Sequence, residues 1–365
     1  MWFKRMPLEE WFDKYQFEID FDIGESAVKT LKLEDIPIDL KDVSLRYGFH
    51  RGKPELRALI AEQYPGLSPD NIIVTSGASE ANFDILSALV KPGEHVIIEH
   101  PNYPSLYEVP RSLGCRVDLF SLNFDRAFRP DWERLEGMFE TDTRLFSLTH
   151  PNNPTGSMIS EEDLRRSVRI AEAKDVYLLF DETYRSMAFE NPLPAAASLS
   201  SKVISISSMS KCYGIPGIRI GWLASRDLGV IERVLSTREQ VSIANNALGE
   251  EIAIQVLRNK DEYLESARRR IAANRAVVDG WMREQRNFEW VPPEAGVVCF
   301  PRIKSEVTVE PEKLYRLLAE KYRTFVVPGR CFEMDERHFR VGFGADAEEI
   351  RVGLRNLDLA LKELT

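Results

Sequence analysis

The chain has 365 residues, of which 44% are hydrophobic, so it is long enough for one large and one small domain with ample material for a core. Its 58 acidic residues outnumber its 48 lysines and arginines, and the formal charge of −10 argues against non-specific binding to nucleic acid or to anionic membranes. The four cysteines form no CxxC pair and accompany no histidine-rich tract, which argues against a zinc site or a disulfide framework.

The N-terminal residues 1–15, MWFKRMPLEEWFDKY, are too acidic and too interrupted for a signal peptide. No run approaches the roughly 18–20 apolar residues that a membrane span needs. We therefore expect a soluble, cytoplasmic protein with reduced thiols, no metal centre, and neither a nucleic-acid nor a membrane partner.

Short apolar runs alternate with amphipathic stretches between residues 71 and 225, and most runs are nearly continuous, as expected for strands covered on both faces. The predicted strands are residues 71–77, 95–100, 144–150, 176–182, 202–208 and 219–225. Ser79 and Ser160 are candidate N-caps of the intervening helices. The alternation predicts an α/β fold with a mostly parallel sheet and with ligands at the carboxyl ends of its strands.

The pattern changes after about Val230, where a long helical region with few turn signals extends to about Trp281. Shorter apolar runs and two further helical patterns follow. We predict three parts: an N-terminal segment of residues 1–45 that packs on the small domain, a large domain of residues 46–245, and a linker helix with a small α+β domain over residues 246–365.

Lys211 lies in the segment SSMSKCYGIPGIRIG (residues 207–221), together with Ser208 near a strand end and Arg219 at the start of the next strand. A single loop lysine is usually only solvated. Here the neighbouring small residues and glycines leave room for a ligand. A lysine amine forms an imine when its surroundings lower its pKa enough to leave the nitrogen nucleophilic.

Two more polar segments follow predicted strands. FDETY (residues 180–184) supplies Asp181 and Tyr184, and HPNNPTG (residues 150–156) supplies Asn153. Asp181 could cap a helix, but a carboxylate there also suits the protonated nitrogen of a pyridine-type ring, which then acts as an electron sink. Tyr184 and Asn153 could donate to the phenolic oxygen of that ring, although Tyr184 could be a packing residue and Asn153 also belongs to a tight loop.

TSGASEAN (residues 75–82) joins a strand to a helix, so the backbone N–H groups of Ala78 and Ser79 would lie at a helix N-terminus, which favours phosphate. PNYPSLY (residues 101–107) contains Tyr103, which could stack on a ring or belong to the core. One aromatic ring and one phosphate would explain all of these strand-end residues together.

These segments, with YGFHRGKPELR (residues 47–57) and FRVGFG (residues 339–344), resemble in order and spacing the class I and II aminotransferases of the aspartate aminotransferase superfamily. The resemblance covers about residues 22–365. It implies fold type I, with a seven-stranded-type sheet flanked by helices and a smaller α+β domain. It also implies pyridoxal 5′-phosphate (PLP) as cofactor, amino-acid and 2-oxo-acid substrates, and a homodimer with shared active sites.

The resemblance also implies roles for the cofactor contacts. Lys211 corresponds to the imine lysine and proton shuttle, and Asp181 to the partner of the pyridine nitrogen. Tyr103 corresponds to the stacking aromatic residue. The implied donors to the phenolic oxygen are Asn153 and Tyr184, and the implied phosphate cradle consists of Ala78, Ser79, Ser208 and Arg219.

Further roles concern the substrate and the second subunit. Arg340 corresponds to the arginine that clamps the substrate carboxylate, for which a planar guanidinium is well suited, and Asn153 also lies on the substrate side. Tyr47 corresponds to a tyrosine that reaches the phosphate of the neighbouring subunit. Gly24 and Glu25 correspond to the N-terminal substrate-side segment.

Two departures from the family pattern concern the substrate. The family often has GEP near the N-terminus, whereas this chain has GES at residues 24–26, and a second arginine for a dicarboxylate substrate is not evident. Residues 7–15 (PLEEWFDKY) and 326–332 (VVPGRCF) are similar to a capreomycidine synthase-like branch, whose members cyclise an arginine-derived substrate.

Amino-group transfer through a Lys211 imine is the leading functional hypothesis. A cyclase of the capreomycidine synthase type, a lyase or a racemase would use the same cofactor residues, so these alternatives stay open. A non-catalytic, aminotransferase-like ligand sensor would carry a DNA-binding domain, for which the residues before Gly24 are too few. A nicotinamide-binding enzyme would need a GxGxxG after the first strand, and no such motif occurs.

Overall fold

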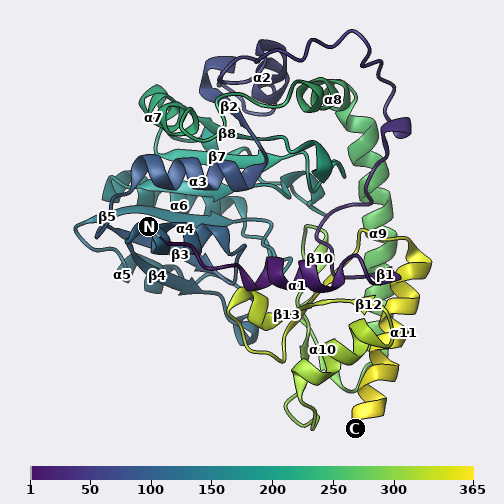
Figure 1. Cartoon of the computed structure of the whole chain (residues 1–365). Helices are drawn as coiled ribbons and strands as arrows, with labels where there is room; N and C mark the ends of the chain where they lie inside the picture. Colours follow the sequence, from purple (N-terminus) through teal and green to yellow (C-terminus); the bar gives the residue numbers. More distant parts are fainter. Residues whose placement is uncertain (1) are drawn as a thin grey trace.

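The computed structural model describes residues 2–365, and within them a seven-stranded sheet forms the centre of the larger region (Figure 1). Its strands are β2 (Ile72–Thr75), β3 (His95–His100), β4 (Arg116–Ser121), β5 (Thr143–Thr149), β6 (Tyr177–Asp181), β7 (Val203–Ser208) and β8 (Gly221–Ser225). Their order is β2-β8-β7-β6-β5-β3-β4, and the neighbouring strands are parallel except in the two pairs that involve β8. The predicted α/β fold with a mostly parallel sheet is confirmed.

Strand β4 is an element that the sequence analysis did not predict. It lies at the edge of the sheet beside β3, and its sequence RVDLFS alternates between more and less exposed positions. A search for continuous apolar runs finds strands that are covered on both faces and misses an edge strand of this kind. The strand predicted at residues 219–225 starts two residues later, because Arg219 has a left-handed φ of 53° and ends a 3-10 turn.

Helices cover both faces of the sheet (Figure 1). One face packs against α3 (Ala78–Leu89), α4 (Ser105–Leu113) and α7 (Leu228–Arg238), and the other against α5 (Trp132–Gly137) and α6 (Glu161–Lys174). The apolar residues of the central strands are buried between these two layers, which leaves the strand ends as the places where polar side chains can meet a ligand.

The two predicted N-caps have different outcomes. Ser160 caps α6 with a capping box, in which its hydroxyl accepts from the Asp163 backbone N–H. The N-cap of α3 is Gly77 and not Ser79, so that prediction is wrong. The tight turn from β2 into α3 requires a φ of 84°, which glycine adopts without strain, and Ser79 therefore lies inside the first helical turn.

Helix α9 (Lys260–Glu284) runs along one side of the molecule and connects the sheet region to a smaller region (Figure 1). The predicted long helical region is divided into α7, α8 (Ala247–Arg258) and α9. The smaller region contains β9 (Phe288–Glu289), β10 (Val298–Cys299), β11 (Arg302–Ile303), α10 (Pro311–Glu320), β12 (Thr324–Phe325), β13 (Val327–Pro328), β14 (Phe339–Gly342) and α11 (Ala347–Leu364). Helix α2 (Pro54–Ala61) packs beside α8.

The N-terminal segment packs against the smaller region, although it is distant from it in sequence. Strand β1 (Phe21–Asp22) pairs in parallel with β12. Helix α1 (Pro7–Tyr15) lies between the sheet region and the smaller region in Figure 1, and the Trp11 indole donates to the Val326 carbonyl at 2.8 Å. The domain boundaries after residues 45 and 245 stay predictions. Of the helices in residues 2–365, none has the length and apolar character to cross a membrane.

Candidate active site

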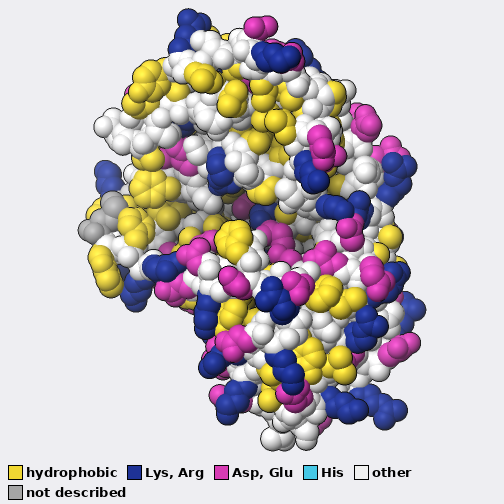
Figure 2. Space-filling view, turned by 45° about the vertical axis from the view of Figure 1, so that its right-hand side comes forward, with side chains coloured by type: hydrophobic (Ala, Val, Ile, Leu, Met, Phe, Trp, Pro, Cys, Tyr) yellow, Lys and Arg dark blue, Asp and Glu magenta, His cyan; other side chains and the backbone are white. Residues whose placement is uncertain are grey.

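A cavity of about 350 Å³ lies at the carboxyl ends of the central strands, between them and α1. Figure 2 shows the molecule hollowed between its larger and smaller regions. The cavity is lined by residues that the sequence analysis had singled out: Ala78, Ser79, Tyr103, Asn153, Asp181, Tyr184, Ser208, Lys211, Arg219 and Arg340. They converge because parallel strands end at the same edge of the sheet, so that the loops following them share one space.

Lys211 lies in the loop after β7, where its amine contacts the N-terminal segment. Its Nζ donates to Glu25 Oε1 at 3.0 Å and to Ser26 Oγ at 3.1 Å. The Lys211 backbone carbonyl accepts from the Val28 N–H at 3.0 Å. Residues 25–28 therefore hold both the backbone and the side chain of the lysine, and the structure adds Glu25 and Ser26 as direct neighbours of the amine.

The ion pair with Glu25 affects the pKa of Lys211. Burial has the largest effect and lowers this pKa, but the Glu25 carboxylate and the Tyr184 hydroxyl together raise it above its ordinary value. Burial alone would raise the pKa of Glu25, but Lys211 and Arg340 lower it to about 2. A nucleophilic amine was expected to have a lowered pKa. In the structure the pKa of Lys211 is instead raised.

Replacing Glu25 with Gln is expected to lower the pKa of Lys211, because burial and the Arg340 charge then act on the amine without an opposing carboxylate. The measurement is the rate of Lys211 acetylation as a function of pH, followed by mass spectrometry of the peptide. The midpoint should move to lower pH in Glu25→Gln. It should not move in Glu10→Gln, an exposed carboxylate on α1, and an unchanged midpoint in Glu25→Gln would contradict the assigned cause.

Asp181 at the end of β6, Tyr184 just after it and Asn153 in the loop after β5 all line the cavity. Asp181 is 7% exposed and its Oδ1 accepts from the Thr183 N–H at 3.0 Å; burial raises its pKa to about 6. The Tyr184 hydroxyl donates to the Ser26 carbonyl at 2.8 Å, so it must release this contact to donate elsewhere. Asn153 Oδ1 accepts from Arg340 at 3.1 Å, which orients its amide nitrogen as the donor that a ligand can use.

The far end of the cavity has the features of an anion site. Ala78 and Ser79 form the first turn of α3, and the hydroxyls of Ser208 and Ser210 lie nearby on the lysine loop. The Arg219 guanidinium donates to neutral oxygens, including Ser210 Oγ at 3.4 Å and the Pro216 carbonyl at 2.9 Å. Its positive charge is therefore not neutralised by a hydrogen-bonded carboxylate in the described part of the chain.

Gly77 and Gly221 allow the end of β2 and the start of β8 to approach closely at this anion site. A Cβ on Gly77 would lie 2.4 Å from the Arg219 guanidinium, and a Cβ on Gly221 would lie 2.5 Å from the Gly77 carbonyl carbon. Side chains at either position would occupy the space in which the arginine and the helix N-terminus meet. The backbone thus forms a cradle whose size and positive charge suit a small anion.

Arg340 lies in β14 of the smaller region and also lines the cavity. It is 1% exposed, and its Nε and Nη2 both donate to the Gly24 carbonyl, at 3.0 and 2.7 Å. Gly24 does not line the cavity; it positions the arginine from behind, and a Cβ there would lie 2.7 Å from the Phe325 ring. The anionic partner that a buried arginine requires is supplied in part by Glu25, whose charge acts on Arg340 without a direct hydrogen bond.

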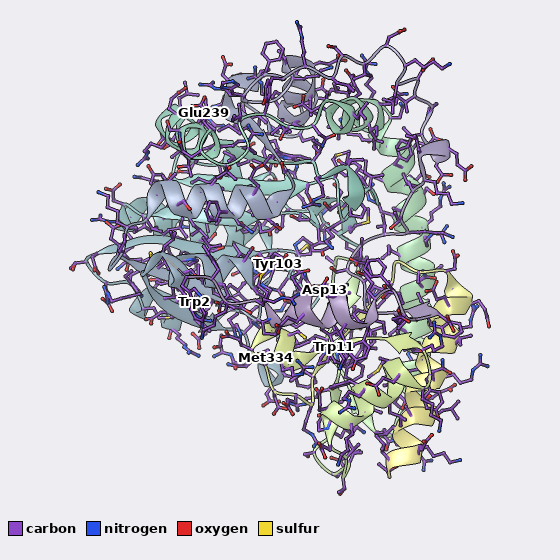
Figure 3. All side chains as sticks on the ribbon, viewed as in Figure 1. Trp2, Trp11, Asp13, Tyr103, Glu239 and Met334 are labelled. Atoms are coloured by element: carbon purple, nitrogen blue, oxygen red, sulfur yellow. The ribbon has the colours of Figure 1, made fainter. Side chains whose placement is uncertain are left out.

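Tyr103 and Tyr47 have different surroundings. The Tyr103 ring lines the cavity, and its hydroxyl donates to Glu9 of α1 at 2.9 Å. Figure 3 labels Tyr103. Tyr47 is 83% exposed and lies outside the cavity of its own chain. Helix α1 and its C-cap residue Gln16 contribute lining residues that the sequence analysis did not single out: Leu8, Glu9, Phe12, Asp13 and Gln16. The sequence of residues 7–15 showed a similarity to the capreomycidine synthase-like branch, but it did not show that these residues lie over the site.

The model of the family "Aminotransferase class I and II" matches residues 18–357. The chain belongs to the class I and II aminotransferase family. Capreomycidine synthase of Streptomyces vinaceus is 28% identical over 95% of this chain and 91% of its own length. Aspartate aminotransferase of Pyrococcus horikoshii is 26% identical, over 98% of this chain and 95% of its own.

The similar solved structures also include both an aminotransferase and a cyclase. A PLP-dependent aminotransferase from Streptococcus suis superposes with a TM-score of 0.94 at 30% identity, over 100% of this chain and 99% of that one. The PLP-dependent cyclase OrfR superposes with a TM-score of 0.91 at 29% identity, over 100% and 98% of the two chains. The aminotransferase fold is therefore common to proteins named for different reactions.

The residues of the cavity fit the PLP cofactor that the family implies. A phosphate matches the cradle between Gly77, Arg219 and the α3 N-terminus, whose arginine has only neutral hydrogen-bond partners. A protonated ring nitrogen matches Asp181, whose buried carboxylate would gain a cationic partner. An aldehyde matches the Lys211 amine, which lines the same cavity as these two groups.

One group of possible metal ligands occurs in residues 2–365, formed by His95, Asp118 and Glu140. It lies at the start of β3, at the end of the sheet opposite the cavity. The His95 ring already contacts Thr143 at 2.7 Å, and Glu140 pairs with Arg116 at 2.7 Å. The absence of a metal centre stays a prediction.

Proposed function

We propose that the protein is a PLP-dependent aminotransferase that moves an amino group between an amino acid and a 2-oxo acid. The observation that carries this proposal is the convergence, in one cavity, of an amine, a buried carboxylate and two arginines: Lys211, Asp181, Arg219 and Arg340. These are the groups that an aldehyde, a ring nitrogen, a phosphate and a substrate carboxylate each require.

In the proposed cofactor site, Lys211 Nζ holds PLP covalently between turnovers. Asp181 accepts a hydrogen bond from the protonated ring nitrogen, and Tyr103 packs against the ring face. The phosphate is bound by the α3 N-terminus at Ala78 and Ser79, with Ser208 and Arg219. Bound in this way, PLP supplies an electron sink for the negative charge that develops when the α-carbon loses its proton.

The remaining roles concern the substrate and the proton. Arg340 binds the α-carboxylate with both terminal nitrogens, and Gly24 and Asn153 keep the guanidinium plane in place. Lys211 Nζ, once displaced by the substrate amine, takes the α-proton and returns it to the cofactor carbon. Tyr184 and Asn153 donate to the phenolic oxygen. Glu25 holds the displaced Lys211 amine near the α-carbon by the contact described above.

A second candidate is a PLP-dependent cyclisation. It is supported by the similarity to capreomycidine synthase and to the cyclase OrfR, which is as extensive as the similarity to the aminotransferases. Elimination and racemisation would use the same residues. All of these reactions start with removal of a proton by Lys211, so the cofactor residues do not distinguish them.

The deciding experiment is a panel of amino donors, including basic and aromatic ones, incubated with the PLP-loaded protein with and without 2-oxoglutarate. For an aminotransferase, we expect sustained product formation only with the acceptor, because the amine form of the cofactor must be returned to the aldehyde. Sustained turnover that does not depend on the acceptor would reject transamination in favour of the cyclase or lyase. Formation of the opposite enantiomer of the donor, without any 2-oxo acid, would indicate racemisation.

We also propose a cytoplasmic homodimer with shared sites. The exposed apolar residues Leu45, Tyr47 and Phe49 are consistent with an interface that brings Tyr47 to the phosphate of the other subunit. Free cysteines and a net charge of −10 support the location. Sedimentation equilibrium tests the dimer: a purely monomeric PLP-loaded protein would contradict it.

A further inference from the structure

A second buried carboxylate, that of Glu99, lies near the end of β3, close to the cavity but outside its lining. The Glu99 side chain is 0% exposed. Its Oε2 accepts from the Thr149 N–H at 2.8 Å and from Asn152 Nδ2 at 3.3 Å. Thr149 lines the cavity and is the cross-strand partner of Asp181. Only strand β5 therefore separates Glu99 from the strand that carries Asp181.

The Glu99 carboxylate has no charged partner of its own. Within the described residues 2–365, the only basic side chain that pairs with it is His150, whose Nε2 lies 2.8 Å from Glu99 Oε1. Neither ring nitrogen of His150 makes an aligned hydrogen bond. A protonated ring would bury two such N–H groups and a neutral ring only one, so this environment favours neutral His150. Glu99 keeps its charge, because the N–H groups that donate to Oε2 stabilise a carboxylate.

A third buried carboxylate near Asp181 differs from Glu99 in this respect. Glu182 is also buried, but the Arg185 Nε lies 3.7 Å from its Oε1 and compensates its charge. Burial raises the pKa of Asp181 to about 6, and the charges of Glu182 and Glu99 act in the same direction. Asp181 therefore lies among negative charges, and one cation bound at its carboxylate would offset them.

We propose that the buried charge of Glu99 makes the site select a cofactor ring whose nitrogen is protonated. This inference rests on the proposed function, because it takes Asp181 to be the partner of that nitrogen. Glu99 does not touch the cofactor; it is a positioning residue that acts through Asp181 and Thr149. Charges interact over such a separation in a buried region, since water and salt screen them little there. A protonated ring is the better electron sink, so Glu99 supports removal of the α-proton.

The test compares the binding of two cofactors to the full-length protein by absorbance titration: PLP, and its analogue in which the ring nitrogen is replaced by C–H. The analogue keeps the aldehyde and the phosphate but cannot carry the proton. We expect the wild type to bind PLP more tightly than the analogue. In Glu99→Gln this preference should fall by about tenfold, the effect of one pKa unit at the nitrogen. Glutamine has the same shape and still offers an oxygen to the Thr149 N–H.

Asp118→Asn is the matched control, because it also removes a carboxylate beside a buried histidine. Asp118 Oδ2 lies 3.3 Å from Nε2 of His95, which begins β3 at the end of the strand opposite Glu99. The preference for PLP should be the same in Asp118→Asn as in the wild type. If Glu99→Gln weakens the binding of both cofactors equally and leaves the preference unchanged, Glu99 only holds the loop after β5 and the proposal is overturned.

A measurement on the wild type needs no variant. Nuclear magnetic resonance of isotope-labelled PLP in the loaded protein should show a protonated ring nitrogen at pH values where free PLP has lost this proton. A deprotonated nitrogen at neutral pH would overturn the proposal and leave the proposed function intact. Failure of the proposed function has a different result, because borohydride would then fix no PLP to Lys211 in the wild type.

Discussion

Lys211→Ala is expected to abolish covalent attachment of PLP and to reduce turnover by about 10²–10⁴-fold from the loss of proton transfer alone. In the proposed function, the amine reacts with the cofactor aldehyde and, after displacement, acts as the base at the α-carbon. Its neighbours Glu25 and Ser26 offer a carboxylate and a hydroxyl, neither of which forms an equivalent bond. We therefore expect no other residue to compensate.

The measurement combines absorbance, borohydride reduction and mass spectrometry of the labelled peptide. The wild type should show an imine absorbance band and a label on Lys211, and Lys211→Ala should show neither. Lys202→Ala is the matched control, because Lys202 pairs with Asp175 on the surface and lies outside the cavity. A label that persists in Lys211→Ala, or a wild type without the band, would show that the cofactor is attached elsewhere or not at all.

Arg340→Lys is expected to lower kcat/KM for amino-acid substrates by about 100-fold, although the charge is retained. The guanidinium has donors enough to bind a carboxylate while it also contacts Gly24 and Asn153. A lysine ammonium is a single point of charge, so it cannot keep these contacts and the bidentate geometry together. Most of the loss should appear as a higher KM if the carboxylate is bound equally in the ground and transition states.

Arg330→Lys provides the matched control in the same region of the fold. Arg330 pairs with Glu312 and lies over the Trp11 ring, but it does not line the cavity. An amine that lacks the α-carboxylate should react equally slowly with wild type and Arg340→Lys, since it has nothing for Arg340 to bind. If Arg340→Lys keeps its melting temperature and its KM for amino acids, the arginine does not bind the substrate carboxylate.

The cofactor half of the candidate site was predictable because its residues lie in short segments at strand ends. TSGAS, FDETY and SMSK each place polar or charged groups within a few residues of a buried strand, and parallel strands end at one edge. The sheet itself was predicted from apolar runs, apart from the edge strand β4, whose alternating pattern gives no continuous run. The local sequence predicts the position of a functional side chain where the neighbouring residues alone place it.

The substrate half depends on contacts between segments that are distant in the chain. Glu25 and Lys211 are 186 residues apart, and Arg340 and Gly24 are 316 residues apart. The raised pKa of Lys211 follows from the first of these contacts and could not be read from the residues around the lysine. The wrong prediction of Ser79 as an N-cap has a similar origin, since the tight β2–α3 turn beside Arg219 requires Gly77.

The sequence by itself determined the fold class and the family resemblance, and it led to the residues that we propose to hold the cofactor. Only the tertiary structure decided that α1 covers the cavity and that the Glu25 carboxylate contributes to raising the pKa of Lys211. The physical reason is that a side chain's direction and charge depend on what packs against it. For the N-terminal segment those partners lie some 300 residues away, in β12 and the loop after it.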